Sequence, residues 1–96
     1  FTLRDVAKIT SENPAQILWI RGKGRIEAGY DADLTIVDME KTAEVGANGF
    51  FTKCGWSPFS GWKLKGWPVM TMIGSQVVYE NGHCNSDVLG KEITYN

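Results

Sequence analysis

The sequence predicts a small α+β fold, with a helical start and a body of β-strands. Three observations support this class. Apolar residues recur at helical spacing in the first twenty residues. Two runs rich in apolar and β-branched residues follow, at 33–38 and at 66–73. Gly74 and Ser75 then separate the second run from another one, which is typical of a two-residue β-hairpin.

Length and composition fit one small domain or a piece of a larger protein. The 96 residues are 43% hydrophobic and 22% charged, with a net charge of −1, which is ordinary for a globular chain. Such a balance gives no electrostatic support for a nucleic-acid or membrane partner. No apolar run reaches membrane-spanning length and no leader is recognisable, so we expect a cytoplasmic protein. The abrupt helical start, without an initiator Met, favours a piece of a longer chain.

The first helix is expected over residues 3–12. Leu3 and Val6 begin its apolar face. Thr2 can cap this helix, and Asp5 follows three residues later, as in a capping box with Asp in place of Glu.

A second helix is expected over residues 15–20. Asn13 is placed to cap it and Pro14 to occupy its first position. Gly22 or Gly24 is expected to end it, because glycine readily adopts the left-handed conformation found at helix ends.

The strand that organises the rest of the chain is expected at 33–38, after a short strand at 25–27 and a turn at 28–30. Both faces of the central strand are largely apolar. Such a pattern is typical of a strand that lies between two layers. We therefore expect Ile36 to belong to the core.

Residues 39–52 lack a clear pattern and are interpreted as a surface loop, with a further strand beginning at 50–53 as one alternative. The next segment, 54–61, is rich in Gly, Pro and Ser and is also interpreted as a loop. Its large aromatic residues, Trp56 and Phe59, are expected to anchor it on the core rather than to stack on a ligand.

A strand is expected at 66–73, with Pro68 near its start suiting a first or edge position. The chain then returns antiparallel over 76–80, and Asn81 with Gly82 forms a second turn. The tail, 83–96, is weakly patterned.

Few residues suit hydrolytic chemistry. His83 is the only histidine, and it is expected in a turn. Cys54 and Cys84 lie far apart without a CxxC spacing, so neither a zinc site nor a disulfide is expected. Asp31, Asp33 and Asp38 could bind a hard cation, but turn and capping roles are favoured. We therefore predict no catalytic, substrate-binding or metal-ligating residue in this segment.

Five segments of the sequence match parts of known enzymes: Thr10–Ala15, Gly24–Leu34, Lys53–Gly61, Gly66–Thr71 and Val77–Gly82. The first two segments resemble the C-terminal region of the amidohydrolase superfamily, where the last helix of a (β/α)₈ barrel leads into a small β-domain. The last three segments resemble the tail of dihydroorotases.

The resemblance implies three parts: the last helix of a truncated (β/α)₈ barrel at 1–21, a small β-sandwich-like domain at 22–82, and a C-terminal tail at 83–96. It implies a zinc hydrolase that reversibly cyclises N-carbamoyl-aspartate to dihydroorotate in pyrimidine biosynthesis. In that family the metal ligands lie on barrel strands upstream of this segment. The segment is therefore expected to be structural, to bind no zinc and to be inactive alone, within a homo-oligomer that takes its small-molecule substrate through the barrel.

Two alternatives remain open. The chain could belong to another cyclic amidohydrolase, an allantoinase or a hydantoinase, although the segment 53–61 favours a dihydroorotase. It could instead be a free-standing binding module that uses Trp56, Trp62 and Trp67.

Overall fold

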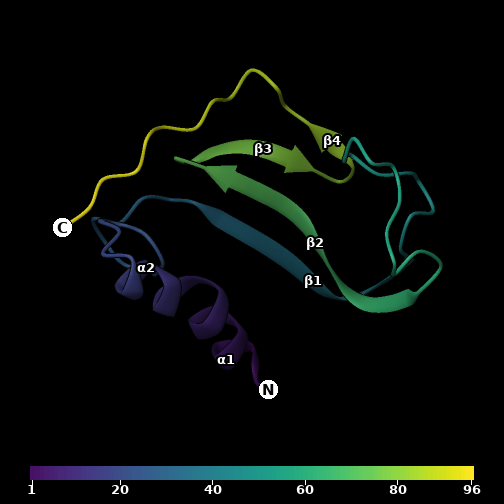
Figure 1. Cartoon of the computed structure of the whole chain (residues 1–96), viewed down its shortest axis with the longest axis horizontal. Helices are drawn as coiled ribbons and strands as arrows, with labels where there is room; N and C mark the ends of the chain where they lie inside the picture. The colour runs from purple at the N-terminus through teal and green to yellow at the C-terminus, as the bar shows by residue number, and fades with distance from the viewer.

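The computed structural model describes all 96 residues and has an α+β fold, as predicted. Three consecutive helical segments precede one antiparallel sheet with the strand order β1-β2-β3-β4. Figure 1 shows the helices beside β1 and the C-terminal segment running back toward the end of α2. The elements are α1 (Leu3–Ala7), the π-helix η1 (Lys8–Glu12), α2 (Asn13–Ile17), β1 (Leu34–Glu44), β2 (Lys63–Ile73), β3 (Gln76–Glu80) and β4 (His83–Cys84). None of the helices combines the length and the apolar character that crossing a bilayer requires.

The predicted capping box starts the first helix. The Thr2 hydroxyl accepts a hydrogen bond from the Asp5 backbone N–H at 3.2 Å, and the Asp5 carboxylate accepts one from the Thr2 N–H at 2.9 Å. Two N–H groups that the helix itself leaves unpaired are thereby satisfied.

The helical run then continues to Ile17 without the expected restart. Asn13 has helical dihedrals, and its N–H donates to the carbonyl of Lys8, five residues earlier. The expected cap at Asn13 is therefore wrong. The wider π-helical turn before Pro14 accommodates a residue that has no N–H, so the helix is not broken there. We call residues 3–17 the helical arm.

The arm ends earlier than predicted, and an aromatic residue makes the left-handed turn. Trp19 has a φ of +56°, directly after the end of α2. Gly22 and Gly24 also have positive φ, but they lie in the loop that follows. No strand forms at 25–27, whereas the turn at 28–30 is present.

The strand expected at 33–38 exists, but it extends to Glu44 and lies at the edge of the sheet as β1. Ile36 and Val37 are each 45% exposed. The prediction of a strand buried between two layers, with Ile36 in the core, is therefore wrong for this chain. β1 pairs with a neighbour on one side only, and no helix packs against a strand.

β2 is longer than predicted and occupies an interior position in the sheet. Pro68 lies within it, opposite Val37 and next to a shift in register, so its expected first or edge position is wrong. An irregularity of this kind leaves room for a residue that cannot donate to the ladder. The segment at 50–53 forms no strand.

The β2–β3 hairpin agrees with the sequence. Gly74 and Ser75 both have positive φ, at 55° and 69°, as a type I′ turn requires. β3 spans the predicted residues, and the following turn leads into the short strand β4. His83 therefore lies in a strand and not in the expected turn.

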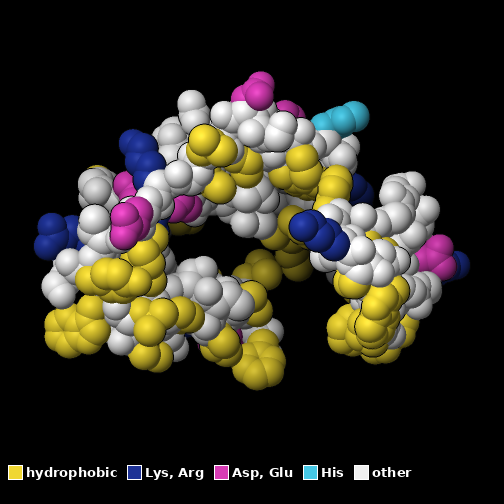
Figure 2. All heavy atoms as spheres, turned by 45° about the horizontal axis from the view of Figure 1, so that its top comes forward, with side chains coloured by type: hydrophobic (Ala, Val, Ile, Leu, Met, Phe, Trp, Pro, Cys, Tyr) yellow, Lys and Arg dark blue, Asp and Glu magenta, His cyan; other side chains and the backbone are white.

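The chain has almost no interior of its own. Ala15, at 8% exposure, is the only buried residue, and the accessible surface is 7955 Å². A compact monomer of 10.7 kDa exposes about 5,500 Å². Figure 2 shows an arch with an open hollow beneath it and hydrophobic side chains gathered at both of its feet. The apolar face of the helical arm is accordingly exposed, with Leu3 at 65% and Ile17 at 73%.

Candidate functional site

The strongest cluster of charged side chains lies where the loop after the helical arm meets the sheet. Lys23 Nζ pairs with Asp31 Oδ2 at 3.1 Å and with Asp33 Oδ2. The other carboxylate oxygen of Asp33 accepts a hydrogen bond from the Gly74 N–H, in the β2–β3 turn, at 2.8 Å. We call Lys23, Asp31 and Asp33 the loop triad.

Electrostatics in this cluster favour the charged forms of Lys23 and Asp33. The hydrogen bond from Lys23, followed by that from the Gly74 N–H, lowers the pKa of Asp33. The hydrogen bonds to Asp33 and then Asp31 raise the pKa of Lys23. A carboxylate whose pKa is lowered by an ion pair accepts a proton less readily, so Asp33 is a poor general base. The Asp33 carboxylate accepts from a turn amide, as the favoured turn role requires, whereas the Asp31 carboxylate pairs with Lys23, which the sequence pattern did not single out.

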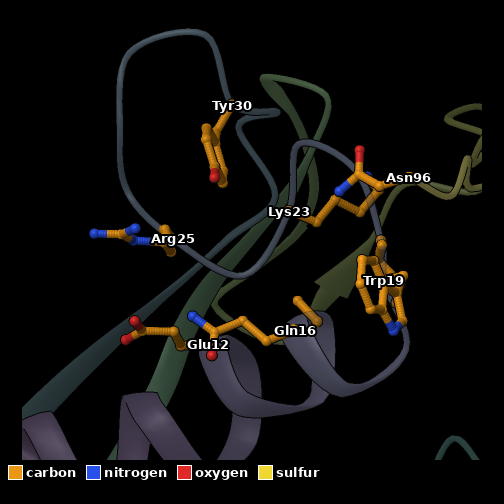
Figure 3. A pocket seen from close by; sticks show the side chains of 9 residues that line it. Glu12, Gln16, Trp19, Lys23, Arg25, Tyr30 and Asn96 are labelled. Atoms are coloured by element: carbon orange, nitrogen blue, oxygen red, sulfur yellow. The ribbon is translucent and has the colours of Figure 1, made fainter.

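A hollow of about 260 Å³ lies between α2 and the following loop. In Figure 3, Glu12 and Gln16 on the helix face Tyr30 on the loop, and Trp19 lies beside Asn96 at one end. The hollow contains neither a histidine nor a cysteine. Its lining residues are Glu12, Ala15, Gln16, Trp19, Ile20, Lys23, Arg25, Tyr30 and Asn96.

The potential metal donors of the chain do not converge. No group of three or more His, Cys, Asp or Glu side chains could hold a metal ion. His83 and Cys84 lie on β4, and Cys54 lies in the loop before β2. The donor set of this segment therefore does not fit a catalytic zinc, which needs about three protein ligands.

Both cysteines are free, as predicted, and both are exposed. Hydrogen bonding by the Thr52 side chain, and then by the backbone of Trp56, lowers the pKa of the Cys54 thiol. A lower pKa increases the fraction of reactive thiolate at neutral pH. No general base accompanies this thiol, because the nearby side-chain partner is only a hydroxyl.

The aromatic residues of the loop before β2 pack on each other rather than into a core. The rings of Phe59 and Trp62 meet edge to face with centroids 5.2 Å apart. Trp56 remains 65% exposed and Phe59 52%. The expectation that this loop is anchored on a core is therefore wrong within this chain, because the chain offers no core to receive it.

Comparisons with known proteins agree with the resemblance seen in the sequence. The profile of the amidohydrolase family matches residues 1–78. The dihydroorotase of Pyrococcus horikoshii is 42% identical over 90 residues, which are 94% of this chain and 20% of that protein. The dihydroorotase of Pyrococcus abyssi is 44% identical over 89 residues, 93% of this chain and 21% of that protein.

A solved structure extends this agreement to the fold. The L-hydantoinase (dihydropyrimidinase) of Arthrobacter aurescens superposes with a TM-score of 0.81 and 33% identity, over 88% of this chain and 19% of that one. The chain thus spans about one fifth of the length of the relatives it matches. The predicted resemblance to dihydroorotases is confirmed.

Proposed function

The chain belongs to the amidohydrolase family, and on that premise we propose that it is the C-terminal part of a dihydroorotase-like cyclic amidohydrolase. The complete enzyme reversibly cyclises N-carbamoyl-aspartate to dihydroorotate in pyrimidine biosynthesis. Support for this reaction comes from the dihydroorotases that are more than 40% identical over most of the chain.

The role of this segment is structural. Its accessible surface exceeds that of a compact monomer of equal mass by about 2,400 Å². An excess of this size matches what one partner contributes to a large obligate interface. In this proposal the remainder of the enzyme covers the excess surface. The excess accessible surface is the single observation on which the structural role of the segment rests.

We assign a separate role to each of three segments of the chain. The segment 1–21 contains the last helix of a (β/α)₈ barrel, and the exposed apolar face of the helical arm packs on that barrel. Residues 22–82 form a small β-sandwich-like domain, in which a second layer covers the open faces of β1 and β2. Residues 83–96 are a C-terminal tail. The complete enzyme is a cytoplasmic homo-oligomer.

The catalytic groups of the proposed enzyme lie outside these residues. Zinc, when bound in the complete enzyme, would supply activated water for the hydrolytic reaction. The donors of this segment do not converge into a site that could hold it. The loop triad contributes by fixing the loop that joins helix and sheet, and no substrate contact is assigned to it.

A second candidate reaction is the hydrolysis of hydantoins. The superposition on an L-hydantoinase at 33% identity favours it, although the identity to dihydroorotases is higher. A free-standing binding module built on Trp56, Trp62 and Trp67 is disfavoured, because such a module needs a core of its own.

The experiment that tests the proposal is a substrate comparison with the complete zinc-loaded enzyme. Dihydroorotate, N-carbamoyl-aspartate, allantoin and a 5-substituted hydantoin are offered at equal concentrations. We expect kcat/KM to be highest for the dihydroorotate pair. Preference for the hydantoin would replace the proposed reaction with the second candidate, and turnover of none of them would overturn the proposal.

A further inference from the structure

The helical arm and the sheet touch only through their junction. No helix packs against a strand, and Figure 1 shows the arm and the sheet joined at one end, where α2 leads into β1. Within these 96 residues, the relative orientation of arm and sheet therefore depends on the residues around 18–33 and on what contacts them. A short connection without further bonds would leave this angle poorly defined.

The C-terminal residues reach this junction from the other end of the chain. The Arg21 N–H donates to the carbonyl of Thr94 at 2.8 Å, and the Asn96 N–H donates to the carbonyl of Trp19 at 2.8 Å. These two bonds flank an antiparallel bridge between Ile20 and Tyr95. We call residues 94–96 the strap.

A side-chain contact adds to the backbone pairing. Arg21 Nε donates to Asn96 Oδ1 at 3.1 Å. Figure 3 shows Asn96 next to Trp19, above the end of the α2 helix. The strap thus contacts three consecutive residues, Trp19 to Arg21, by backbone and side chain together.

The turn that the strap holds is a strained one. Trp19 has a φ of +56°, a conformation that bulky residues rarely adopt. Such a residue persists only where the surroundings hold it. Its carbonyl is the acceptor of the Asn96 N–H, so the strap fixes the residue at which the chain leaves α2.

We propose that the strap fixes the orientation of the helical arm relative to the sheet by closing an antiparallel bridge over the left-handed turn at Trp19. Other contacts act at the same junction. Gly24 of the connecting loop lies against Ala15 of α2, and the same loop is bonded to the β2–β3 turn, through Asp33 to the Gly74 N–H and through the Ala32 carbonyl to the Ser75 N–H. The strap adds a contact from residues 94–96, and it assigns a role to the tail. The inference does not depend on which cyclic amide the enzyme hydrolyses.

The test uses Asn96→Pro in the complete protein. Proline has no N–H, so the bond to the Trp19 carbonyl is lost, and the preceding Tyr95 already has the extended conformation that proline prefers before it. Asn96→Ala is the matched control, because it keeps the N–H and loses only the contact with Arg21. Hydrogen exchange at single-residue resolution then measures the exchange rate of the Arg21 amide, which donates to the Thr94 carbonyl.

We expect Asn96→Pro to speed exchange at Arg21 by about tenfold and Asn96→Ala to change it much less. Spin labels on Lys8→Cys and Glu80→Cys, in a background lacking Cys54 and Cys84, report the distance between arm and sheet. The distribution of this distance should broaden in Asn96→Pro and not in Asn96→Ala. Equal exchange rates and equal distance distributions in both variants would overturn the proposal. Neither readout uses turnover, so failure here is distinct from failure of the proposed reaction.

The unmodified protein provides a second test, in case the proline variant does not fold. The Arg21 amide should exchange at least about tenfold more slowly than that of Gly22, which donates to no protein acceptor. If these two neighbouring amides exchange at equal rates after correction for their intrinsic rates, the proposal is also overturned.

Discussion

Replacing Gly24 by alanine tests how the loop is seated on the helical arm. Gly24 has a φ of +92°, and a Cβ there would lie 2.6 Å from the Ala15 Cβ and 2.8 Å from the carbonyl oxygen of Ser11. Both separations are too short for real atoms, and one of them involves backbone, which cannot swing away. Ala15 is also the only buried residue of the chain. We expect the loop to be pushed off α2.

The magnitude follows from two additive costs. A left-handed conformation costs an alanine about 1–2 kcal/mol, and forcing extra volume into a filled site costs about 1–3 kcal/mol more. Gly29→Ala is the matched control, because Gly29 has a φ of +90° and nothing within 4 Å of the added Cβ. The two variants should therefore differ by about 2 kcal/mol, which is about a thirtyfold difference in the local opening constant.

Hydrogen exchange in the complete protein measures this difference. The amides of Leu18 and Ile20 donate to the carbonyls of Pro14 and Ala15, at 3.0 and 2.9 Å. Their exchange should accelerate strongly in Gly24→Ala and only slightly in Gly29→Ala. Equal protection of these amides in the two variants would refute the reasoning, because only the contact with α2 distinguishes them.

Four further outcomes are expected. The isolated 96-residue polypeptide should self-associate and bind a hydrophobic dye, because it exposes about 2,400 Å² more than a compact monomer; a compact, dye-free monomer in sedimentation would contradict this. Ile36→Asp should cost about 3 kcal/mol in the complete protein, where the proposed second layer covers this half-exposed residue; an unchanged unfolding curve would show that nothing covers it. Because Lys23 holds the pKa of Asp33 below 3.8, the Asp33 carboxylate stabilises the fold above that pH and loses its effect as the pH falls through the lower folded-state value; an NMR titration with a midpoint above 3.8 would be inconsistent with the ion pair. Both thiols should titrate without reductant, and Thr52→Ala should slow the reaction of Cys54, because the hydrogen bond with Thr52 lowers the pKa of that thiol; an unchanged rate at Cys54 would count against this bond.

Local features of the fold could be predicted because a few neighbouring residues determine them. The capping box needs only Thr2 and Asp5, which lie within one helical turn. The hairpin needs only Gly74 and Ser75, whose positive φ sets the turn type and the register of β3. No distant part of the chain has to be known for either.

The errors arose where distant residues decide the structure. The end of the helical arm depends on the strap, some 75 residues later, so the left-handed residue is Trp19 rather than a glycine. The apolar character of both faces of β1 indicates burial, yet Ile36 is half exposed in this chain. A sequence pattern reflects the environment in the complete protein, and most of that environment lies outside these residues.

The candidate site shows the same limit. A turn role for Asp33 was predictable from the surrounding turn residues, but the pairing of Lys23 with Asp31 and Asp33 was not, because it requires the loop to fold back on itself. The prediction that this segment contains no catalytic residue rests on its inventory of one histidine and two distant cysteines, and it remains a prediction.

Complementation tests the central claim most directly. The 96-residue polypeptide and the remainder of the enzyme are produced separately, and turnover of dihydroorotate with added zinc is measured for each piece and for their mixture. The account predicts no turnover by the polypeptide alone and recovery of activity when the two pieces are combined. Turnover by the purified polypeptide alone, or full activity of the remainder without it, would contradict the claim that this segment is a structural part of a cyclic amidohydrolase.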